Sequence, residues 1–308
     1  MGLAMCQEFE DAALPAGMVK AVDPKADELY RQAVAFDKAG KYGKAIDALE
    51  EIVFYHELSP NAPQARFMMG QMYEKEQDYR QAFKEYGKVI SRYHNSTYYT
   101  KALNRQLALA LDAASGKMRT PVMWGLWSSE METSVVEDWL QEIVRNAPYN
   151  DMASTALSVL AKYQLRNDKM ASARETYRQL AYNYPDNSLA PGALLMVAKL
   201  WAEERARGNN NLVNITKAQE AYEEFLLRYP NHKESAAARK QVGNMRSLLV
   251  SQELEVGKYY LFRAHEYGAA MQCFQNVINE AKQNPEAARE ARKLYRQARS
   301  LDAGSAQQ

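Results

Sequence analysis

The sequence predicts an all-α protein, a solenoid of about five to six stacked antiparallel helical hairpins wound into a right-handed superhelix. Small residues recur at a nearly constant period, and large apolar residues surround them at helical spacing. Short polar turns separate the helical stretches, and prolines end several of them. One such hairpin cannot bury its own apolar face, so the chain needs stacked copies to form a core.

The pattern is clearest between Asn150 and Pro185. Its markers, in order, are Ala161, the turn Asn167-Asp168, Ala173, Tyr177 and Pro185. Two small residues let antiparallel helices approach closely, and the proline stops the second helix. This arrangement resembles the tetratricopeptide repeat (TPR), a helical hairpin of about 34 residues.

Copies of this hairpin precede and follow it. The first begins at Ala26, with Gly40 suited to a left-handed turn, and the second carries Gly70 and Tyr86 at the matching positions. A third has its first helix at 97–114 and its second only at 130–145. A fifth ends at Pro230, after which the helical pattern is too long for one TPR helix and turns near His265.

These elements predict three parts of the chain. Residues 1–24 form an N-terminal tail, and residues 25–284 form the solenoid with insertions at 115–129 and 207–214. The second insertion is rich in glycine and asparagine, which indicates a flexible turn. Residues 285–308 form a polar capping helix and a tail that frays from Asp302.

Composition and motifs exclude several functional classes. Among 308 residues, 39 Lys and Arg balance 38 Asp and Glu, so no overall field attracts nucleic acid or an anionic membrane. No apolar run approaches the roughly 18 residues that would span a bilayer. Phosphate-binding, dinucleotide and hydrolase motifs are absent, and neither the four histidines nor the two cysteines have metal-ligand spacing. We therefore expect a soluble, non-catalytic protein without metal or cofactor.

The start of the chain leaves two possibilities open. Its apolar run ends at Cys6, as the end of a bacterial lipoprotein signal does, although Met5 replaces the usual small residue. Five residues are also fewer than the roughly 15–30 of a signal peptide. Cys6 is thus either a lipidation site, which places the protein on the periplasmic face of the outer membrane, or a free thiol in a loose tail.

The insertion at 115–129 is longer than a TPR turn and contains Trp124 and Trp127. Long loops are often functional. The two tryptophans either fold back over the hairpin as a plug or form an exposed patch that binds a partner.

Solenoids of this type bind extended peptides or helices in a groove lined by their first helices. If Ala33 and Gly70 are the close-packed positions, the groove residues are Tyr30, Val34, Asp37, Phe67, Gln71 and Glu74. Their acidic character is opposite to what a peptide carboxylate requires, whereas the aromatic rings suit an aromatic-rich extended segment. The alternative is that these residues pack against the N-terminal tail.

The later part of the chain resembles one family. Its matching residues are Glu253-Leu254, Val256, Tyr259-Tyr260, Arg263, Tyr267, Ala269-Ala270, Phe274 and Val277-Ile278. This pattern is similar to that of the outer-membrane β-barrel assembly lipoproteins (BamD/YfiO-like), a TPR-repeat family, of which the chain would be a divergent member. The family's glycine after the arginine is absent, His265 occupies that turn, and one extra residue separates Tyr260 from Tyr267.

The resemblance implies a scaffold that helps β-barrel proteins insert into the outer membrane. Its partners would be the barrel-forming subunit and unfolded outer-membrane protein segments, with membrane contact only through a lipid anchor. It places Arg263 at the contact with a periplasmic domain of the barrel-forming subunit. An arginine that only caps its own helix is the alternative. A generic TPR adaptor in another complex, serving cell-wall growth or secretion, is the second functional hypothesis.

Overall fold

The computed structural model describes residues 14, 22–122, 127–206 and 212–305. Within these ranges it contains thirteen α-helices, one π-helical turn and one pair of short strands. The fold is an all-α TPR solenoid, as the sequence predicts. The chain divides into two compact units, Met1–Asp168 and Lys169–Gln308, and each is described by itself.

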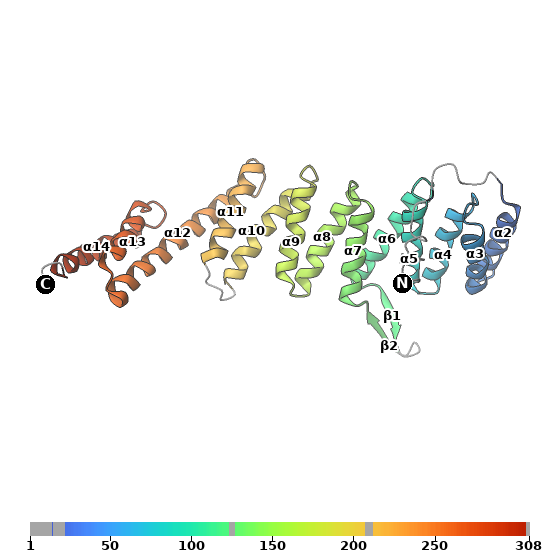
Figure 1. Ribbon diagram of the computed structural model, residues 1–308, viewed down its shortest axis with the longest axis horizontal. Coiled ribbons are helices and arrows are strands. Elements are labelled where there is room, and N and C mark those ends of the chain that lie inside the picture. The colour runs from blue at the N-terminus through green and yellow to red at the C-terminus, as the bar shows by residue number, and fades with distance from the viewer. Residues whose placement is uncertain (1–13, 15–21, 123–126, 207–211, 306–308) are drawn as a thin grey trace, which may run out of the picture. The chain divides into compact units, whose positions relative to one another are not determined.

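The first unit contains three consecutive helical hairpins and one further helix (Figure 1). Its helices are α2 (Pro24–Lys38), α3 (Tyr42–Tyr55), α4 (Ala62–Lys75), α5 (Tyr79–Arg92), α6 (Tyr99–Ala114), α7 (Thr133–Asn146) and α8 (Asp151–Arg166). Two apolar clusters fill the seams, one centred on α2 to α4 and one on α5 to α8.

The second unit begins at the following helix and ends in an added one. Its elements are α9 (Met170–Asn183), α10 (Ala190–Ala206), α11 (Leu212–Arg228), α12 (Ser235–Tyr259), the π-helical turn η1 (Tyr260–Ala264), α13 (Tyr267–Asn279) and α14 (Pro285–Ser305). The last helix packs on α13 and α12 through Ala287, Ala291 and Ala298, so it covers the end of the apolar core as a capping helix should.

Local chemistry explains where the helices begin and turn. The Asp23 carboxylate accepts a hydrogen bond from the Ala26 N–H at 3.2 Å, and Pro24 follows it at the first helical position. Asp78 and Asn150 cap α5 and α8 in the same way. Gly40 has φ +69°, the left-handed conformation predicted for the turn after α2.

The small residues predicted to mark the seams are buried. Ala33, Ala45, Ala82, Ala173 and Ala270 all have no exposed surface. Their large partners in the seams are buried with them: Leu49, Tyr86, Tyr177, Phe274 and Val277. The predicted register of the repeats is therefore confirmed.

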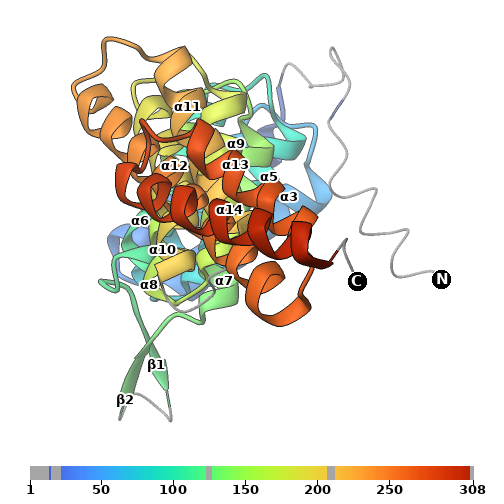
Figure 2. The same cartoon turned by 90° about the vertical axis from the view of Figure 1, so that its left-hand side faces the viewer.

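The segment 115–129 differs from the irregular loop that the sequence indicates. Strands β1 (Arg119–Val122) and β2 (Trp127–Glu130) pair antiparallel, with Arg119 opposite Glu130 and Val122 opposite Trp127. The ribbon extends away from the helices of the first unit (Figures 1 and 2). Four-residue strands are too short to show a two-residue periodicity, which is why the sequence pattern does not reveal them.

Two predicted boundaries are also wrong. The glycine- and asparagine-rich break is expected to continue to Asn214, but α11 begins at Leu212 and buries Asn214 and Ile215. Burial of Ile215 and Asn214 in this first turn outweighs the polar composition of the residues before it. At the other end, α14 continues past the expected fraying point at Asp302 to Ser305.

Candidate functional site

The six residues predicted to line a groove lie on two first helices. Tyr30, Val34 and Asp37 lie on α2, and Phe67, Gln71 and Glu74 lie on α4. Gln71 is exposed, whereas the other five are partly buried. Tyr30 and Val34 pack against the apolar cluster of the first two hairpins, and so does Leu14 from the N-terminal segment.

Side chains on α4 bind those on α2 across this face. The Gln64 amide donates a hydrogen bond to the Tyr30 hydroxyl at 2.5 Å, and Lys75 forms an ion pair with Asp37. The Lys75 ammonium also lies 5.3 Å from the centre of the Tyr42 ring. The acidic group at Asp37 is thus neutralised within the protein.

The carboxylate of Glu74 is engaged as well. Arg105 on α6 donates to both of its oxygens, with Nε 3.0 Å from Oε1, and the Tyr86 hydroxyl donates to Oε1 at 2.5 Å. Burial and the neighbouring Glu74 raise the pKa of the Tyr86 phenol, so it remains a hydrogen-bond donor. A two-pronged arginine contact of this kind fixes α4 against α6.

Aromatic contacts complete the connection. The Phe67 ring lies 5.3 Å from the Tyr86 ring and 5.4 Å from the Tyr98 ring. The partners Lys75, Arg105 and Tyr98 were not among the predicted site residues. Each lies about one repeat length along the chain from the residue it contacts, and that spacing is the signal that could have found them. Contacts within the protein therefore hold the side chains of the predicted groove in place, and its carboxylates are paired with cations.

The C-terminal hairpin contains an unusual turn. The backbone N–H groups of His265 and Glu266 both donate to the Tyr260 carbonyl, which closes the π-helical turn η1. His265 has φ +59°, the left-handed conformation for which glycine is the usual residue. A π-helical turn accommodates one residue more than an α-helical turn. The segment between Tyr260 and Tyr267 therefore holds one residue more than a regular α-helical turn would allow.

An exposed apolar surface surrounds Arg263 on this turn. Tyr259 is 60% exposed, Phe262 50% and Val256 36%. They lie away from the side of the helix that buries Leu254 and packs into the core. Arg263 is exposed and, among the described residues, has no hydrogen-bond or ion-pair partner. We call Val256, Tyr259, Phe262 and Arg263 the C-terminal patch; its aromatic members are absent from the predicted site, although the Tyr-Tyr-Leu-Phe run could have indicated them.

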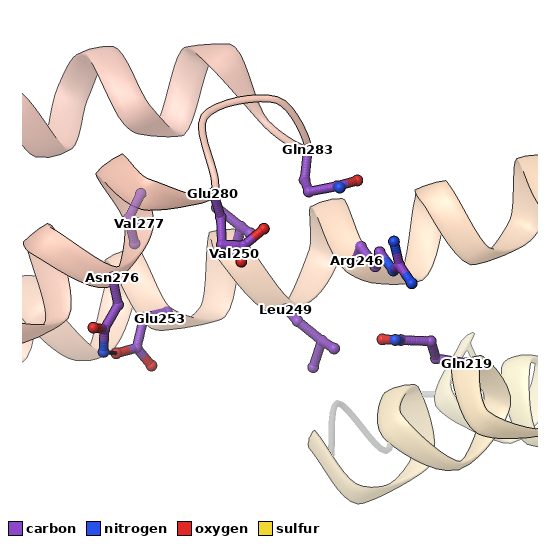
Figure 3. A pocket seen from close by; sticks show the side chains of 9 residues that line it. All are labelled: Gln219, Arg246, Leu249, Val250, Glu253, Asn276, Val277, Glu280 and Gln283. Atoms are coloured by element: carbon purple, nitrogen blue, oxygen red, sulfur yellow. Dashed lines mark hydrogen bonds between the residues drawn. The ribbon is translucent and has the colours of Figure 1, made fainter. Parts of the chain in front are cut away.

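A cavity of about 400 Å³ lies between α11 and α13, with α12 as its floor (Figure 3). Leu249, Val250 and Val277 provide its apolar surface. Glu253 and Glu280 also line it. We call this cavity the α11–α13 groove.

Hydrogen bonds arrange part of its lining. Arg246 and Gln219 both donate to Glu223 Oε1, at 2.7 and 3.0 Å, and Asn276 donates to Glu253 Oε1 at 3.1 Å. Although burial acts to raise it, the hydrogen bonds from Arg246 and Gln219 hold the pKa of Glu223 below its usual value. Figure 3 shows Leu249 between the hydrogen-bonded Glu253 and Asn276 on one side and Gln219 on the other.

The other predicted positions are placed as follows. Cys6 and Trp124 lie outside the described residues, and Trp127 belongs to β2 with its side chain undescribed. No group of three or more His, Cys, Asp or Glu suited to a metal ion occurs in the ranges that the structure describes. Every helix within those ranges is too short or too polar to span a bilayer.

Comparison with protein families identifies two stretches as tetratricopeptide repeats. One match covers residues 30–92, which contain the six residues predicted to line a groove, and the other covers residues 156–187. The first match covers the first two predicted hairpins and the second match covers the hairpin of 150–185, and no enzymatic family is indicated. No curated protein matches the chain.

Solved structures of other repeat proteins share the helical arrangement only loosely. MamA from Desulfovibrio magneticus RS-1 is 15% identical, with 69% of this chain and 99% of that chain covered and a TM-score of 0.30. The C-terminal part of a TPR protein from Cytophaga hutchinsonii is 13% identical, with coverages of 85% and 86% and a TM-score of 0.33. PilF from Pseudomonas aeruginosa is 15% identical, with coverages of 89% and 99% and a TM-score of 0.29. Likeness at this level carries no argument about function.

Proposed function

We propose that this chain, a tetratricopeptide-repeat solenoid, is a non-catalytic scaffold whose main partner surface is the C-terminal patch. Repeat solenoids present extended surfaces for protein partners. The patch is the observation that carries the proposal. It combines two half-exposed aromatic rings with an arginine that has no partner among the described residues.

The chemistry of the patch suits a protein interface. Tyrosine and arginine are enriched among residues that dominate binding energy, and exposed apolar groups mark such surfaces. The guanidinium of Arg263 can bind a partner carboxylate with two hydrogen bonds. Phe262 and Tyr259 would then exclude water around that pair.

The partner we propose is the barrel-forming subunit of the outer-membrane β-barrel assembly machinery, with unfolded barrel segments as further ligands. The support is the resemblance of α12, η1 and α13 to the assembly lipoproteins, which includes Arg263. The departures from the family pattern at His265 are accommodated by the π-helical turn. In this proposal a lipid on Cys6 anchors the scaffold at the periplasmic face of the outer membrane.

The test is recovery of the partner with tagged chain from outer-membrane extract. Arg263→Glu should reduce recovery of the barrel-forming subunit at least tenfold, because reversing an interfacial charge commonly costs several kcal/mol of binding. Arg299→Glu is the matched control, since Arg299 is an exposed arginine on α14 without a partner among the described side chains. Undiminished recovery with Arg263→Glu would show that the C-terminal patch is not the partner surface.

The identity of the recovered protein separates the two functional hypotheses. Recovery of a cell-wall or secretion component that depends on Arg263 would retain the scaffold and reject barrel assembly. Incorporation of labelled palmitate that is lost in Cys6→Ser would support the anchor. Equal labelling of the unaltered chain and of Cys6→Ser would show that Cys6 carries no lipid.

A further inference from the structure

The groove that precedes the α11–α13 groove in the chain has a different lining. It lies between α9 and α11 over α10. The Arg174 guanidinium lies 3.5 Å from the centre of the Trp201 ring and forms an ion pair with Glu204. Aligning Ala173 with Ala218 gives the equivalent positions one repeat later.

At those positions Gln219 replaces the arginine, Arg246 the tryptophan and Leu249 the glutamate. Arg246 turns to Glu223 instead of covering the floor, so Leu249 remains accessible in the cavity. The two cavities have similar volumes, about 360 and 400 Å³, but the second lacks the cation, the aromatic ring and the ion pair that line the first.

The charges of the α11–α13 groove are unbalanced. Glu280 has no ion-pair partner among the described residues, and the hydrogen bond to Glu253 Oε1 comes from the neutral amide of Asn276. Glu280 is also the C-cap of α13, where the helix dipole places further negative potential. A cation in this groove would interact favourably with both carboxylates and with the helix end.

We propose that the α11–α13 groove is a second protein-binding site, which takes an extended partner segment carrying an aliphatic side chain beside a lysine or arginine. The aliphatic side chain lies on Leu249, Val250 and Val277, and the basic group lies between Glu253 and Glu280. A volume of about 400 Å³ is at the lower end of the range for ligand pockets and suits one or two side chains.

An extended segment fits better than a helix because its backbone groups need partners. Gln283 makes no side-chain hydrogen bond within the described ranges, and Gln219 uses only its donor nitrogen. Their amides can donate to and accept from a peptide backbone. A helix satisfies its own backbone and would leave them unused.

The inference rests on the proposed scaffold role, but it concerns a different surface, so the two can fail separately. The probes are end-blocked, fluorescein-labelled octapeptides Gly-Ser-Thr-Leu-Thr-Lys-Ser-Gly, a version with Glu in place of Lys, and a version with Ser in place of Leu. Binding to purified full chain is measured by fluorescence anisotropy. The lysine peptide should bind at least tenfold more tightly than either other peptide, and its affinity should fall as salt rises.

Variants locate the site. Glu280→Lys and Leu249→Gln should each weaken the lysine peptide at least tenfold, and the lysine variant should keep its fold because a cation suits a helix C-terminus. Glu51→Lys, the same charge change on an exposed position of α3, and Arg263→Glu should leave binding unchanged. Melting curves by circular dichroism establish that each variant is folded.

Three results would overturn the proposal. One is equal binding of the lysine and glutamate peptides, or none by either, and another is unchanged affinity in Glu280→Lys. The third is a dimer in sedimentation analysis that Leu249→Gln dissociates, since the occupant would then be a second copy of this chain.

Discussion

Gly257 on α12 lies so close to the Phe274 ring of α13 that a Cβ atom at this glycine would be 2.6 Å from the ring carbon Cε1. The same relation recurs in the second hairpin, where a Cβ at Gly70 would be 2.6 Å from the Tyr86 ring. Both rings are fully buried. In each case the glycine has no side chain, so the two helices of a hairpin approach closely. One aromatic ring then fills the seam between them.

The first prediction is that Gly257→Ala destabilises the protein by about 1–3 kcal/mol, because the added methyl group forces the ring or a helix to move. Thermal unfolding followed by circular dichroism measures it. Gly243→Ala is the control, because it lies in the same helix with no atom within 4 Å of its Cβ position. There alanine should be neutral or stabilising by up to about 1 kcal/mol. Equal losses in both variants would contradict the close packing.

The second prediction concerns the β-ribbon. Arg119 and Glu130 are paired across it, so an Asn-Gly turn between them can replace residues 120–129 and close the chain at the same point. This deletion should leave the melting temperature nearly unchanged, since it keeps Met118 and Met131, which are buried in the core. The sequence alone predicts that deletion of Lys117 to Ser128 leaves folding largely intact and alters association with a partner, but that deletion would also remove the buried Met118.

Met118→Ala gives the comparison, with an expected loss of about 2–3 kcal/mol for a buried methionine. If the Asn-Gly deletion were as destabilising as this substitution, the ribbon itself would contribute to the fold. That result would favour the plug hypothesis for Trp124 and Trp127 over a partner surface.

The third prediction tests a buried ion pair. Arg66 on α4 contacts Glu85 on α5 at 3.0 Å, and both side chains are over nine-tenths buried. Arg66→Met should cost about 3 kcal/mol, because the buried Glu85 carboxylate then keeps Lys88 as its one ion-pair partner among the described residues. Replacing both residues, as Arg66→Met with Glu85→Leu, should recover most of that loss, since no unpaired charge remains.

Urea unfolding measures these differences. Arg80→Met is the control, because the ion pair of Arg80 with Glu132 is exposed and should contribute less than about 1 kcal/mol. If the double variant were no more stable than Arg66→Met, the loss of stability would come from the missing ion pair and not from the Glu85 carboxylate left without Arg66.

The seams of the repeats could be predicted from the sequence because they depend on residue size at fixed spacing. Ala33, Ala173 and Phe274 are buried as their positions in the repeat require. The partners across the first helices could not be predicted so directly. Helical periodicity shows which face carries Glu74, but it does not specify that Arg105 lies close enough to bind it.

Short or irregular elements were missed for a different reason. The β-ribbon is paired only over four residues a strand, and the π-helical turn depends on a single additional residue within an otherwise helical pattern. Neither changes hydrophobic periodicity enough to be recognised. The lining of the α11–α13 groove differs from that of the preceding groove at three positions, and the effect of these differences becomes clear only when the helices are in place.

The last prediction uses Cys273, which faces the side of α12 that carries Glu253. Burial, together with the adjacent Glu253 carboxylate, raises the pKa of the Cys273 thiol to about 11. Only the thiolate reacts with iodoacetamide, so in a Cys6→Ser background the labelling rate should rise about tenfold per pH unit between about pH 7 and 10 without levelling off. Glu253→Gln removes the negative charge, lowers the pKa of the Cys273 thiol and should accelerate labelling several-fold at pH 8. Glu255→Gln is the control and should not change the rate, because Glu255 forms an ion pair with Lys258. A rate that levels off near pH 9 in the Cys6→Ser protein would place the thiol in water, away from Glu253.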